Sequence, residues 1–443
     1  MLSEISKRTW IAGLLMILLV TACAPSPGPS ASPTVEPSPV VQITQAQEPP
    51  EPPPALPSAT PKIKPTTAPV PTLPPAVGPA LAYLKSGDIW IVDKPETDPY
   101  PLTVAGDIKS FTWAPNAERL AAFNGRTLCF YYRDGSLRTA CLELGLTDEQ
   151  AQVDRRLVLS PDQRWAVIWN PATPPPDGEI GWIIVALDTT NAMYRILDPV
   201  DWGAVIPDID EPGGFTGKPV FLPDGRLVGA ISHRSTCTTE GCSYQLYVFD
   251  FQDRQFSPFN PSSETLPPGS VSDGTALEIS SDGRLLAEYG TLFEDCEAYS
   301  TNVAIFDLES MTGTSDSLAD ENVTGIDFQP ESKQAVISRS KGCRNPTAQN
   351  WAITCGLVSD QELLPIQLWT PKAEPRLDLV PGITPAWSPD GKWIVFESCL
   401  SQEGDDAWQP DGSTAPMLFL LDPSSQVIKA IDQGELPQWQ PPI

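Results

Sequence analysis

Carboxylates are the most abundant side chains in this sequence that could take part in chemistry. The 443 residues include 56 acidic residues, 28 lysines and arginines and one histidine, for a formal net charge of −28. A Ser-His-Asp or Cys-His site would have to use that histidine, His233, and no Gly-x-Ser-x-Gly turn is present. We therefore predict no catalytic residue and a protein that is not an enzyme. Paired carboxylates, as in glycosidases, stay open because their separation cannot be read from a sequence.

Two acidic stretches have side chains that suit a hard cation. Asp208, Asp210 and Glu211 form one, and Asp405 and Asp406 form the other. Their oxygens could ligate calcium, but neither stretch matches a defined calcium loop, and no Cys-x-x-Cys pair indicates zinc. We predict no metal and no cofactor. Because the net charge repels phosphate backbones, we expect no nucleic-acid partner.

Nine cysteines suggest a disulfide-bonded, exported protein. One of them, Cys23, follows an apolar leader, and eight remain, an even number that predicts four disulfides. Cys129 and Cys141 flank a short turn, and Cys237 and Cys242 bracket one loop. For the remaining four we expect the pairs Cys296–Cys343 and Cys355–Cys399, with Cys343–Cys355 and Cys296–Cys399 as the alternative.

One repeated stretch indicates which elements would position these groups. In Trp387-Ser-Pro-Asp-Gly-Lys-Trp-Ile-Val-Phe396, Pro389 pre-sets φ for a tight turn and Gly391 supplies the positive φ that closes it. The apolar run that follows predicts a buried strand. Weaker copies of the stretch occur at Phe111–Pro115, Val158–Asp162, Val220–Gly225, Leu277–Gly283 and Ile326–Pro330. Second apolar runs such as Val303–Asp307 follow most copies, which indicates four strands per roughly 50 residues, as in a β-propeller.

The two ends of this array complete each other. The strands expected at Leu81–Tyr83 and Asp88–Asp93 lack a preceding inner strand, and Leu436–Pro441 is an inner strand without the rest of its sheet. We predict that the C-terminal strand pairs with the first one, which leaves no large open sheet edge. The fold class is therefore all-β: a single β-propeller of seven four-stranded blades, with six or eight as alternatives.

The phrase Ala386–Phe396 and its copies resemble the propeller repeat of TolB-like, Trp-Asp-like proteins. The resemblance covers residues 79–443 and implies a propeller architecture. It implies little about chemistry, because propellers host binding proteins, scaffolds and several unrelated enzymes.

The chain before residue 79 is expected to anchor the propeller. In residues 1–23, Lys7 and Arg8 precede an apolar run too short to span a bilayer comfortably. The run ends in Val20-Thr-Ala-Cys23, which resembles a bacterial lipobox and implies lipidation of Cys23. Residues 24–78 are rich in Pro, Ser and Thr and predict a disordered linker. We expect a lipoprotein held at the membrane of the bacterial cell envelope and facing outside the cytoplasm.

Loop lengths predict which face of the propeller would bind a ligand. The Pro-Asp-Gly turns are short, whereas the stretches 170–180, 290–302, 339–364 and 398–416 are long and expected on the opposite face. Aromatic and acidic residues suited to anchoring a ligand occur on the long loops or on the 197–218 connection: Trp351, Trp408, Trp202, Tyr299, Asp405 and Asp406.

These features lead to two classes of function. The first is a binding module for a protein, peptide or glycan of the envelope, or an assembly scaffold similar to TolB-like proteins. The alternative is an enzyme, a hydrolase or lyase, that acts on an envelope polymer through carboxylates on the propeller face. Two or three close carboxylates beside an open, aromatic-lined pocket would favour the enzyme.

Overall fold

The computed structural model divides the chain into two units, Met1–Ala68 and Pro69–Ile443, and its described residues belong to the second unit. The described residues are 79–136, 141–152, 155–169, 182–188, 193–197, 212–233, 244–251, 253, 255–259, 262–263, 275–290, 300–319, 322–341, 362–370, 377–398, 400–401, 409–410 and 416–442. They form an all-β fold with one short helix, α1 (Asp148–Gln152). No helix in these ranges is long and apolar enough to cross a membrane.

The first sheet contains both ends of the described chain. Its strand order is β3 (Tyr100–Pro101), β2 (Asp88–Val92), β1 (Leu81–Lys85) and β32 (Glu435–Trp439). The antiparallel register of β1 and β32 places Leu81 opposite Trp439. The predicted pairing of the C-terminal strand with the first strand is therefore confirmed, and β32 covers an edge of β1 that would otherwise be open.

The sheets that follow repeat one pattern, in which strands adjacent in sequence pair antiparallel. The second sheet contains β4 (Ser110–Trp113), β5 (Arg119–Phe123), β6 (Thr127–Tyr132) and β7 (Leu142–Glu143), and the third contains β8 (Arg156–Leu159), β9 (Trp165–Trp169), β10 (Trp182–Asp188) and β11 (Met193–Leu197).

Two sets of four strands are joined into one larger sheet by a single parallel pairing of Lys218 with Ala276. The first set is β12 (Pro212–Phe221), β13 (Leu227–His233), β14 (Tyr244–Asp250) and β15 (Gln255–Pro258), and the second is β17 (Thr275–Ile279), β18 (Leu285–Gly290), β19 (Ser300–Asp307) and β20 (Thr312–Ala319). The short strand β16 (Ser262–Ser263) pairs with β20.

The last two sheets complete the pattern. They contain β21 (Asn322–Phe328), β22 (Ala335–Lys341), β24 (Pro365–Trp369) and β25 (Leu377–Pro381), followed by β26 (Ile383–Trp387), β27 (Ile394–Ser398), β30 (Met417–Asp422) and β31 (Val427–Gln433). The short strand β23 (Glu362–Leu363) pairs with β22, and β28 (Leu400–Ser401) pairs with β29 (Gln409–Pro410).

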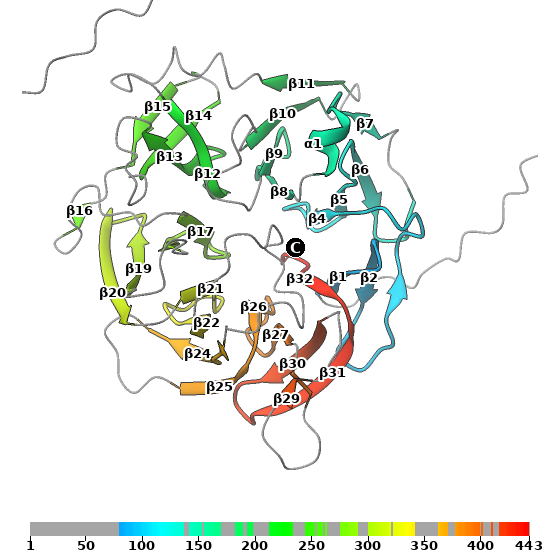
Figure 1. The fold of residues 1–443 in the computed structure, drawn as a ribbon, viewed down its shortest axis with the longest axis vertical. Coiled ribbons are helices and arrows are strands. Elements are labelled where there is room, and N and C mark those ends of the chain that lie inside the picture. The colour runs from blue at the N-terminus through cyan, green and yellow to red at the C-terminus, as the bar shows by residue number, and fades with distance from the viewer. Residues whose placement is uncertain are drawn as a thin grey trace, which may run out of the picture. The chain divides into compact units, whose positions relative to one another are not determined.

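The hydrophobic cores lie between successive sheets and close into a cycle. Each core lies between two neighbouring sets of strands, which are named here by one strand of each. The sequence is β1 with β4, β4 with β8, β8 with β13, β13 with β18, β18 with β22, β22 with β27, and β27 with β1. Large side chains such as Phe123, Trp369 and Phe396 are fully buried there, and each such burial contributes about 1.5–3 kcal/mol. The arrangement is β-propeller-like, and Figure 1 shows β4, β8, β12, β17, β21, β26 and β32 around the centre.

The repeated turn has a side-chain network that explains its sequence. Ser388 Oγ donates to Asp390 Oδ1 (2.7 Å) and accepts the backbone N–H of Trp393 (2.9 Å). Gly391 adopts φ 67°, as its turn position requires. The same serine–aspartate contacts occur in the turns after β8 and β17. In these three turns the motif therefore holds the inner strand to its neighbour through the same bonds.

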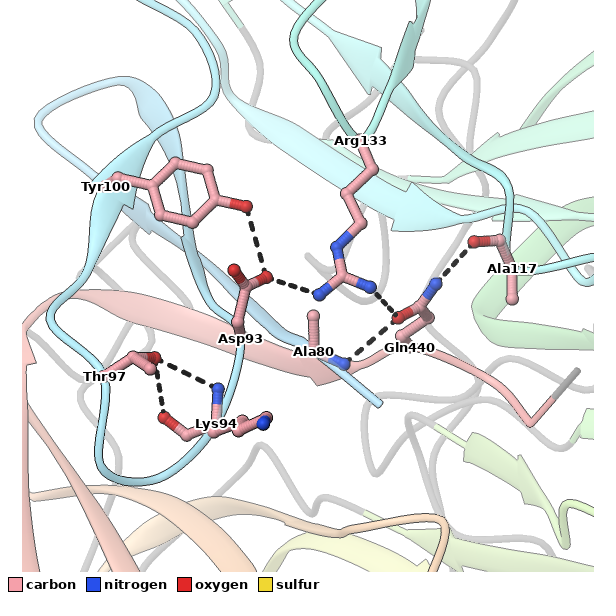
Figure 2. Close-up of polar contacts among 8 residues, drawn as sticks. All are labelled: Ala80, Asp93, Lys94, Thr97, Tyr100, Ala117, Arg133 and Gln440. Atoms are coloured by element: carbon pink, nitrogen blue, oxygen red, sulfur yellow. Dashed lines mark hydrogen bonds and ion pairs between the residues drawn. The ribbon is translucent and has the colours of Figure 1, made fainter. Parts of the chain in front are cut away.

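A second network lies where the chain ends meet. Gln440, which is buried, donates from Nε2 to the Ala117 carbonyl (2.6 Å) and accepts the Ala80 N–H at Oε1 (3.1 Å). Arg133 donates to the same Oε1 (3.1 Å) and also pairs with Asp93. Figure 2 shows that these contacts converge on Gln440. One side chain thus ties the end of the closing strand to the first and second sheets.

One predicted disulfide falls within the described residues. The sulfur atoms of Cys129 and Cys141 are 2.00 Å apart. The register of β6 and β7, with Thr127 opposite Glu143 and Leu128 opposite Leu142, places the two cysteines opposite each other. The other six cysteines expected in disulfides lie outside the described residues, so their pairings remain predictions: Cys237, Cys242, Cys296, Cys343, Cys355 and Cys399. Cys23, the predicted lipidation site, also lies outside them.

Candidate functional site

A cavity of about 830 Å³ lies between the innermost strands of the sheets. Its lining includes residues of β4, β8, β12, β17, β21, β26 and β32, the strands that lie around the centre of Figure 1. The lining extends from the first residues of these strands, such as Ser110 and Thr384, to the prolines of the turns that follow, such as Pro115 and Pro389. The cavity is therefore axial.

The turn motif sets which residues of each inner strand line the cavity. Each inner strand leads into an equivalent turn, so equivalent lining residues occur at a fixed distance before that turn. In each inner strand, one lining residue lies three positions before the proline of the following turn. In the turn after β17, Ser281 takes the place of that proline. The seven residues are Thr112, Val158, Val220, Glu278, Asp327, Ala386 and Gln438. Equivalent positions thus carry quite different chemistry around the ring.

The charged lining residues lie on one side of the ring. Apart from Asp282 in a turn, they are Arg156, Lys218, Glu278 and Asp327, on β8, β12, β17 and β21. We call these four residues the charged sector. The strands β26, β32 and β4 complete the ring with uncharged lining residues, and we call them the closure sector.

An ion pair connects two strands of the charged sector. Lys218 Nζ donates to Glu278 Oε2, and the two side chains remain 28% and 22% exposed. Burial alone would lower the pKa of Lys218, but Glu278 and its acidic neighbours hold that pKa above its usual value. Lys218 is therefore charged at neutral pH and fixes the position of the Glu278 carboxylate.

Asp327 has the opposite electrostatic environment. Its Oδ2 accepts the backbone N–H of Trp387 (2.5 Å) and its Oδ1 accepts that of Phe328 (2.9 Å). Burial, followed by repulsion from Glu278, raises the pKa of Asp327 to about 8 despite these donors and Lys218. Asp327 therefore keeps its proton at neutral pH, when most carboxyl groups have lost theirs.

Tyr289 adds a neutral hydrogen-bond donor to this group. It lies on β18, is 6% exposed and also lines the cavity. Burial raises the pKa of Tyr289 to about 12, although Lys218 acts in the opposite direction. Its hydroxyl is therefore neutral and can donate a hydrogen bond to a bound oxygen atom.

A further buried carboxyl group lies behind the closure sector. Glu397 on β27 is 4% exposed, and its Oε1 accepts hydrogen bonds from Thr384 Oγ1 (2.5 Å) and the Leu436 N–H (2.9 Å). Burial raises the pKa of Glu397 to about 7. Because it holds the start of β32 against β26, its position indicates a structural role.

Aromatic side chains form much of the cavity wall. Trp113 Nε1 donates to the Gln438 carbonyl, and Trp439 Nε1 donates to the Ala386 carbonyl, both at 3.1 Å. Trp387 occupies the equivalent position on β26. Its Nε1 has no hydrogen-bond partner among the described residues, while its backbone N–H bonds Asp327. Trp113 and Trp439 therefore link inner strands of the closure sector, and Trp387 is the tryptophan bonded to a carboxyl group of the charged sector.

The predicted ligand-binding residues cannot be placed with this cavity. Trp351, Trp408, Trp202, Tyr299, Asp405 and Asp406 lie outside the described residues, as do Asp208, Asp210 and Glu211. Within the described ranges, no three His, Cys, Asp or Glu side chains are arranged to hold a metal ion.

Four of the cavity residues described above were not predicted from the sequence: Lys218, Glu278, Asp327 and Tyr289. A signal for two of them was available, because Glu278 and Asp327 occupy the same position before two copies of the turn motif. The copies at Thr112, Val158 and Ala386 have no charge there. What was missing was the knowledge that this position lines a shared cavity.

Comparisons with known proteins give no family and several solved structures of low sequence identity. No protein-family model and no curated protein matches the sequence. Solved structures similar to the chain include a putative 6-phosphogluconolactonase from Bacteroides uniformis, with 12% identity, TM-score 0.48, and coverage of 82% of this chain and 99% of that one. Another is the tricorn protease, with 10% identity, TM-score 0.47, and coverage of 81% of this chain but only 34% of the protease.

An oligogalacturonate lyase in complex with manganese is also similar, with 10% identity, TM-score 0.44, and coverage of 81% of this chain and 85% of the lyase. These structures share a β-propeller-like fold with the chain. The sequence analysis predicted that the protein is not an enzyme, and this prediction is corrected, because the structures that resemble it include a lactonase-type protein and a lyase. Its reasoning relied on the lone histidine and overlooked the carboxyl groups that the inner strands bring together.

Proposed function

We propose that the protein is an enzyme, a hydrolase or lyase, that cleaves a polymer of the cell envelope by acid–base chemistry in the central cavity. The observation that carries this proposal is the pair of cavity-lining carboxyl groups of Asp327 and Glu278. They occupy equivalent positions on β21 and β17, two strands that include residues with Cα atoms within 8 Å of each other. Asp327, whose pKa is raised by burial and by Glu278, can act as an acid, and Glu278, which accepts a hydrogen bond from Lys218, is the candidate base. Trp387, whose backbone N–H bonds Asp327, and Tyr289 line the same cavity, so the two carboxyl groups lie in an aromatic-lined pocket of the kind that favours an enzyme over a binding module.

The roles of the two carboxyl groups follow from their surroundings. Asp327, with a pKa of about 8, donates its proton to the oxygen of the leaving group as the bond breaks. Glu278, oriented by Lys218, accepts a proton from the attacking water in hydrolysis or from a carbon atom in an elimination. In either case one proton enters the leaving group and one reaches Glu278, so transfer through solvent restores both groups. Tyr289 supplies a neutral donor beside the reacting oxygen.

The cellular setting of this proposal comes from the sequence. Lipidation of Cys23 and the 24–78 linker would hold a TolB-like, seven-bladed propeller at the envelope, facing outside the cytoplasm. The strand order of the described sheets supports that number of blades. The long-loop residues, Trp351 and Trp408 among them, remain predicted contacts for an envelope protein, peptide or glycan.

Activity assays on matched variants test the proposal. The full-length chain is incubated with polysaccharides and peptidoglycan isolated from bacterial envelopes, and new reducing ends and unsaturated products are measured. We expect Asp327→Asn and Glu278→Gln each to lower the rate by at least about 100-fold, the usual contribution of a general acid or base. The exposed carboxylates Glu96 and Asp98 serve as controls, as Glu96→Gln and Asp98→Asn. Equal activity in all four variants would refute the assignment.

A further inference from the structure

The candidate site is enclosed by a complete ring of strands. The lining comes from an inner strand of every set of four, and the pairing of β32 with β1 closes the ring. The core between β27 and β1, which includes Val395, Leu420 and Tyr83, fills the junction. Among the described residues, therefore, no gap between sheets leads sideways to Asp327 or Glu278.

The two carboxyl groups lie well below the rim of the cavity. Asp327 is three residues before Pro330, and Glu278 is three residues before Ser281. At about 3.3 Å per residue of strand, each lies roughly 10 Å below its turn. A volume of about 830 Å³ is within the range of sites that bury one small ligand. A polymer that lay across the rim would not bring its interior bonds to this depth.

The turns around the rim form a stiff, largely apolar mouth. Pro115, Pro161, Pro223, Pro330 and Pro389 all line it. Adjacent turns touch: a Cβ atom on Gly283 would lie 2.1 Å from Pro223 Cγ, so only glycine fits, and its φ is +70°. Proline has no backbone N–H and fixes φ, so this rim is pre-shaped and offers few donors.

We propose that substrate reaches the site end-on through this proline-lined mouth, so that the enzyme acts on the ends of linear chains and not on their interior. This inference rests on the proposed function for its chemistry. The topological reason is that a site inside a closed ring admits a chain only by threading one of its ends. The face with the short turns, which the sequence analysis expected to contact no ligand, then carries the entrance.

Access can be measured without any activity. Ala386→Cys in the full-length chain places a thiol on the cavity wall, beside the position of Asp327 on the next sheet. The thiol is treated with two maleimide-bearing polyethylene glycols of equal mass, one with the maleimide at a chain end and one with it at the midpoint. Labelling of the peptide that carries the introduced thiol is followed by mass spectrometry without reductant, so that Cys129–Cys141 stays closed.

We expect the end-labelled polymer to react at least about tenfold faster than the midpoint-labelled one. At an exposed control, Arg284→Cys, the two rates should be equal. Adding Ser281→Trp to Ala386→Cys narrows the mouth and should slow the end-labelled polymer by about tenfold, whereas Arg284→Trp on the same turn should not. Equal rates of the two polymers at Ala386→Cys would overturn the inference, and so would an unimpeded Ser281→Trp double variant.

The cleavage products distinguish this inference from the proposed function. An enzyme that acts on ends releases small products while the mean length of the polymer hardly changes. If the wild type shortened the polymer rapidly and Asp327→Asn did not, this result would contradict end-on access and support the proposed chemistry. Selective labelling without any cleavage would support end-on access and contradict the proposed chemistry.

Discussion

The charged sector and the closure sector are built on the same strand register, yet they use it for different purposes. In the closure sector, Trp113 and Trp439 donate to carbonyl groups of the preceding inner strand, and Gln438 Nε2 donates to the Phe111 carbonyl (3.0 Å). In the charged sector, Lys218 and Glu278 bond each other across two strands. The comparison shows that the inner strands of the closure sector are linked by neutral hydrogen bonds, while those of the charged sector supply titratable groups to the cavity.

Trp387 marks the boundary between the two sectors. It has the position of Trp113 and Trp439, but its Nε1 lacks a hydrogen-bond partner among the described residues. Its backbone N–H instead bonds the carboxyl group of Asp327. Trp387, which is equivalent to the strand-linking Trp113 and Trp439, therefore contacts the candidate acid Asp327 through its backbone.

Removal of the closing strand should have the largest effect. Deleting Glu435–Ile443 exposes the edge of β1 and removes Gln440, Trp439 and the hydrogen bond from the Leu436 N–H to Glu397. We expect loss of cooperative thermal unfolding and aggregation, because an open edge pairs with other chains. Deleting only Pro442 and Ile443 is the control and should leave the transition intact. A long truncation that melts like the full chain would show that the ring does not depend on β32.

A change in the charged sector should affect activity far more than stability. Glu278→Gln keeps an oxygen that can accept from Lys218, so the melting temperature should move by only about 2 °C. Catalysis should fall at least about 100-fold because the base is lost. Calorimetry and initial rates on one preparation measure both effects. Unfolding of this variant at assay temperature would assign Glu278 a mainly structural role.

A change in the closure sector should do the reverse on a smaller scale. Gln440→Ala leaves the Ala80 N–H and the Ala117 carbonyl without their side-chain partner. Each buried group left unpaired costs about 1–3 kcal/mol, so the free energy of unfolding should drop by a few kcal/mol. The exposed Gln433, changed to Ala, is the matched control for denaturant titration. If the two variants had the same free energy of unfolding, Gln440 would not contribute to ring closure.

The pH dependence of stability tests whether Asp327 keeps its proton in the folded state. The pKa of Asp327 is raised to about 8 from 3.8, so the folded state retains a proton that the unfolded chain loses. Its contribution to stability is complete below about pH 4 and is lost as pH rises through about 8. Burial of Glu397, whose pKa is about 7, acts in the same direction. Melting temperatures between pH 5 and 8.5 should fall less steeply for Asp327→Asn than for the wild type, and parallel curves would contradict the assignment.

Much of the fold could be predicted from the sequence because its signal is local. The Ser-Pro-Asp-Gly turn is specified by residues within a few positions of one another, as the bonds of Ser388 to Asp390 and Trp393 show. The closing role of Leu436–Pro441 followed from counting inner strands at both ends of the chain. Both predictions depended on patterns that repeat along the chain.

The candidate site could not be predicted because its groups are distant in sequence. Lys218, Glu278 and Asp327 come from three strands, and more than 100 residues separate Lys218 from Asp327. No motif around any of the three residues indicates a site. Their meeting depends on the convergence of inner strands, and the raised pKa of Asp327 depends on burial and on Glu278. The sequence analysis instead favoured aromatic residues on long loops, where composition alone gives a signal.

The most direct test of the division between sectors is a paired measurement on Glu278→Gln and Gln440→Ala. For each variant, kcat/KM on the cleavable envelope polymer and the free energy of unfolding are determined at pH 7. The account predicts that Glu278→Gln loses at least about 100-fold in kcat/KM with little change in stability. It predicts that Gln440→Ala loses stability and keeps its activity while folded. Full activity in Glu278→Gln, or lost activity in folded Gln440→Ala, would contradict it.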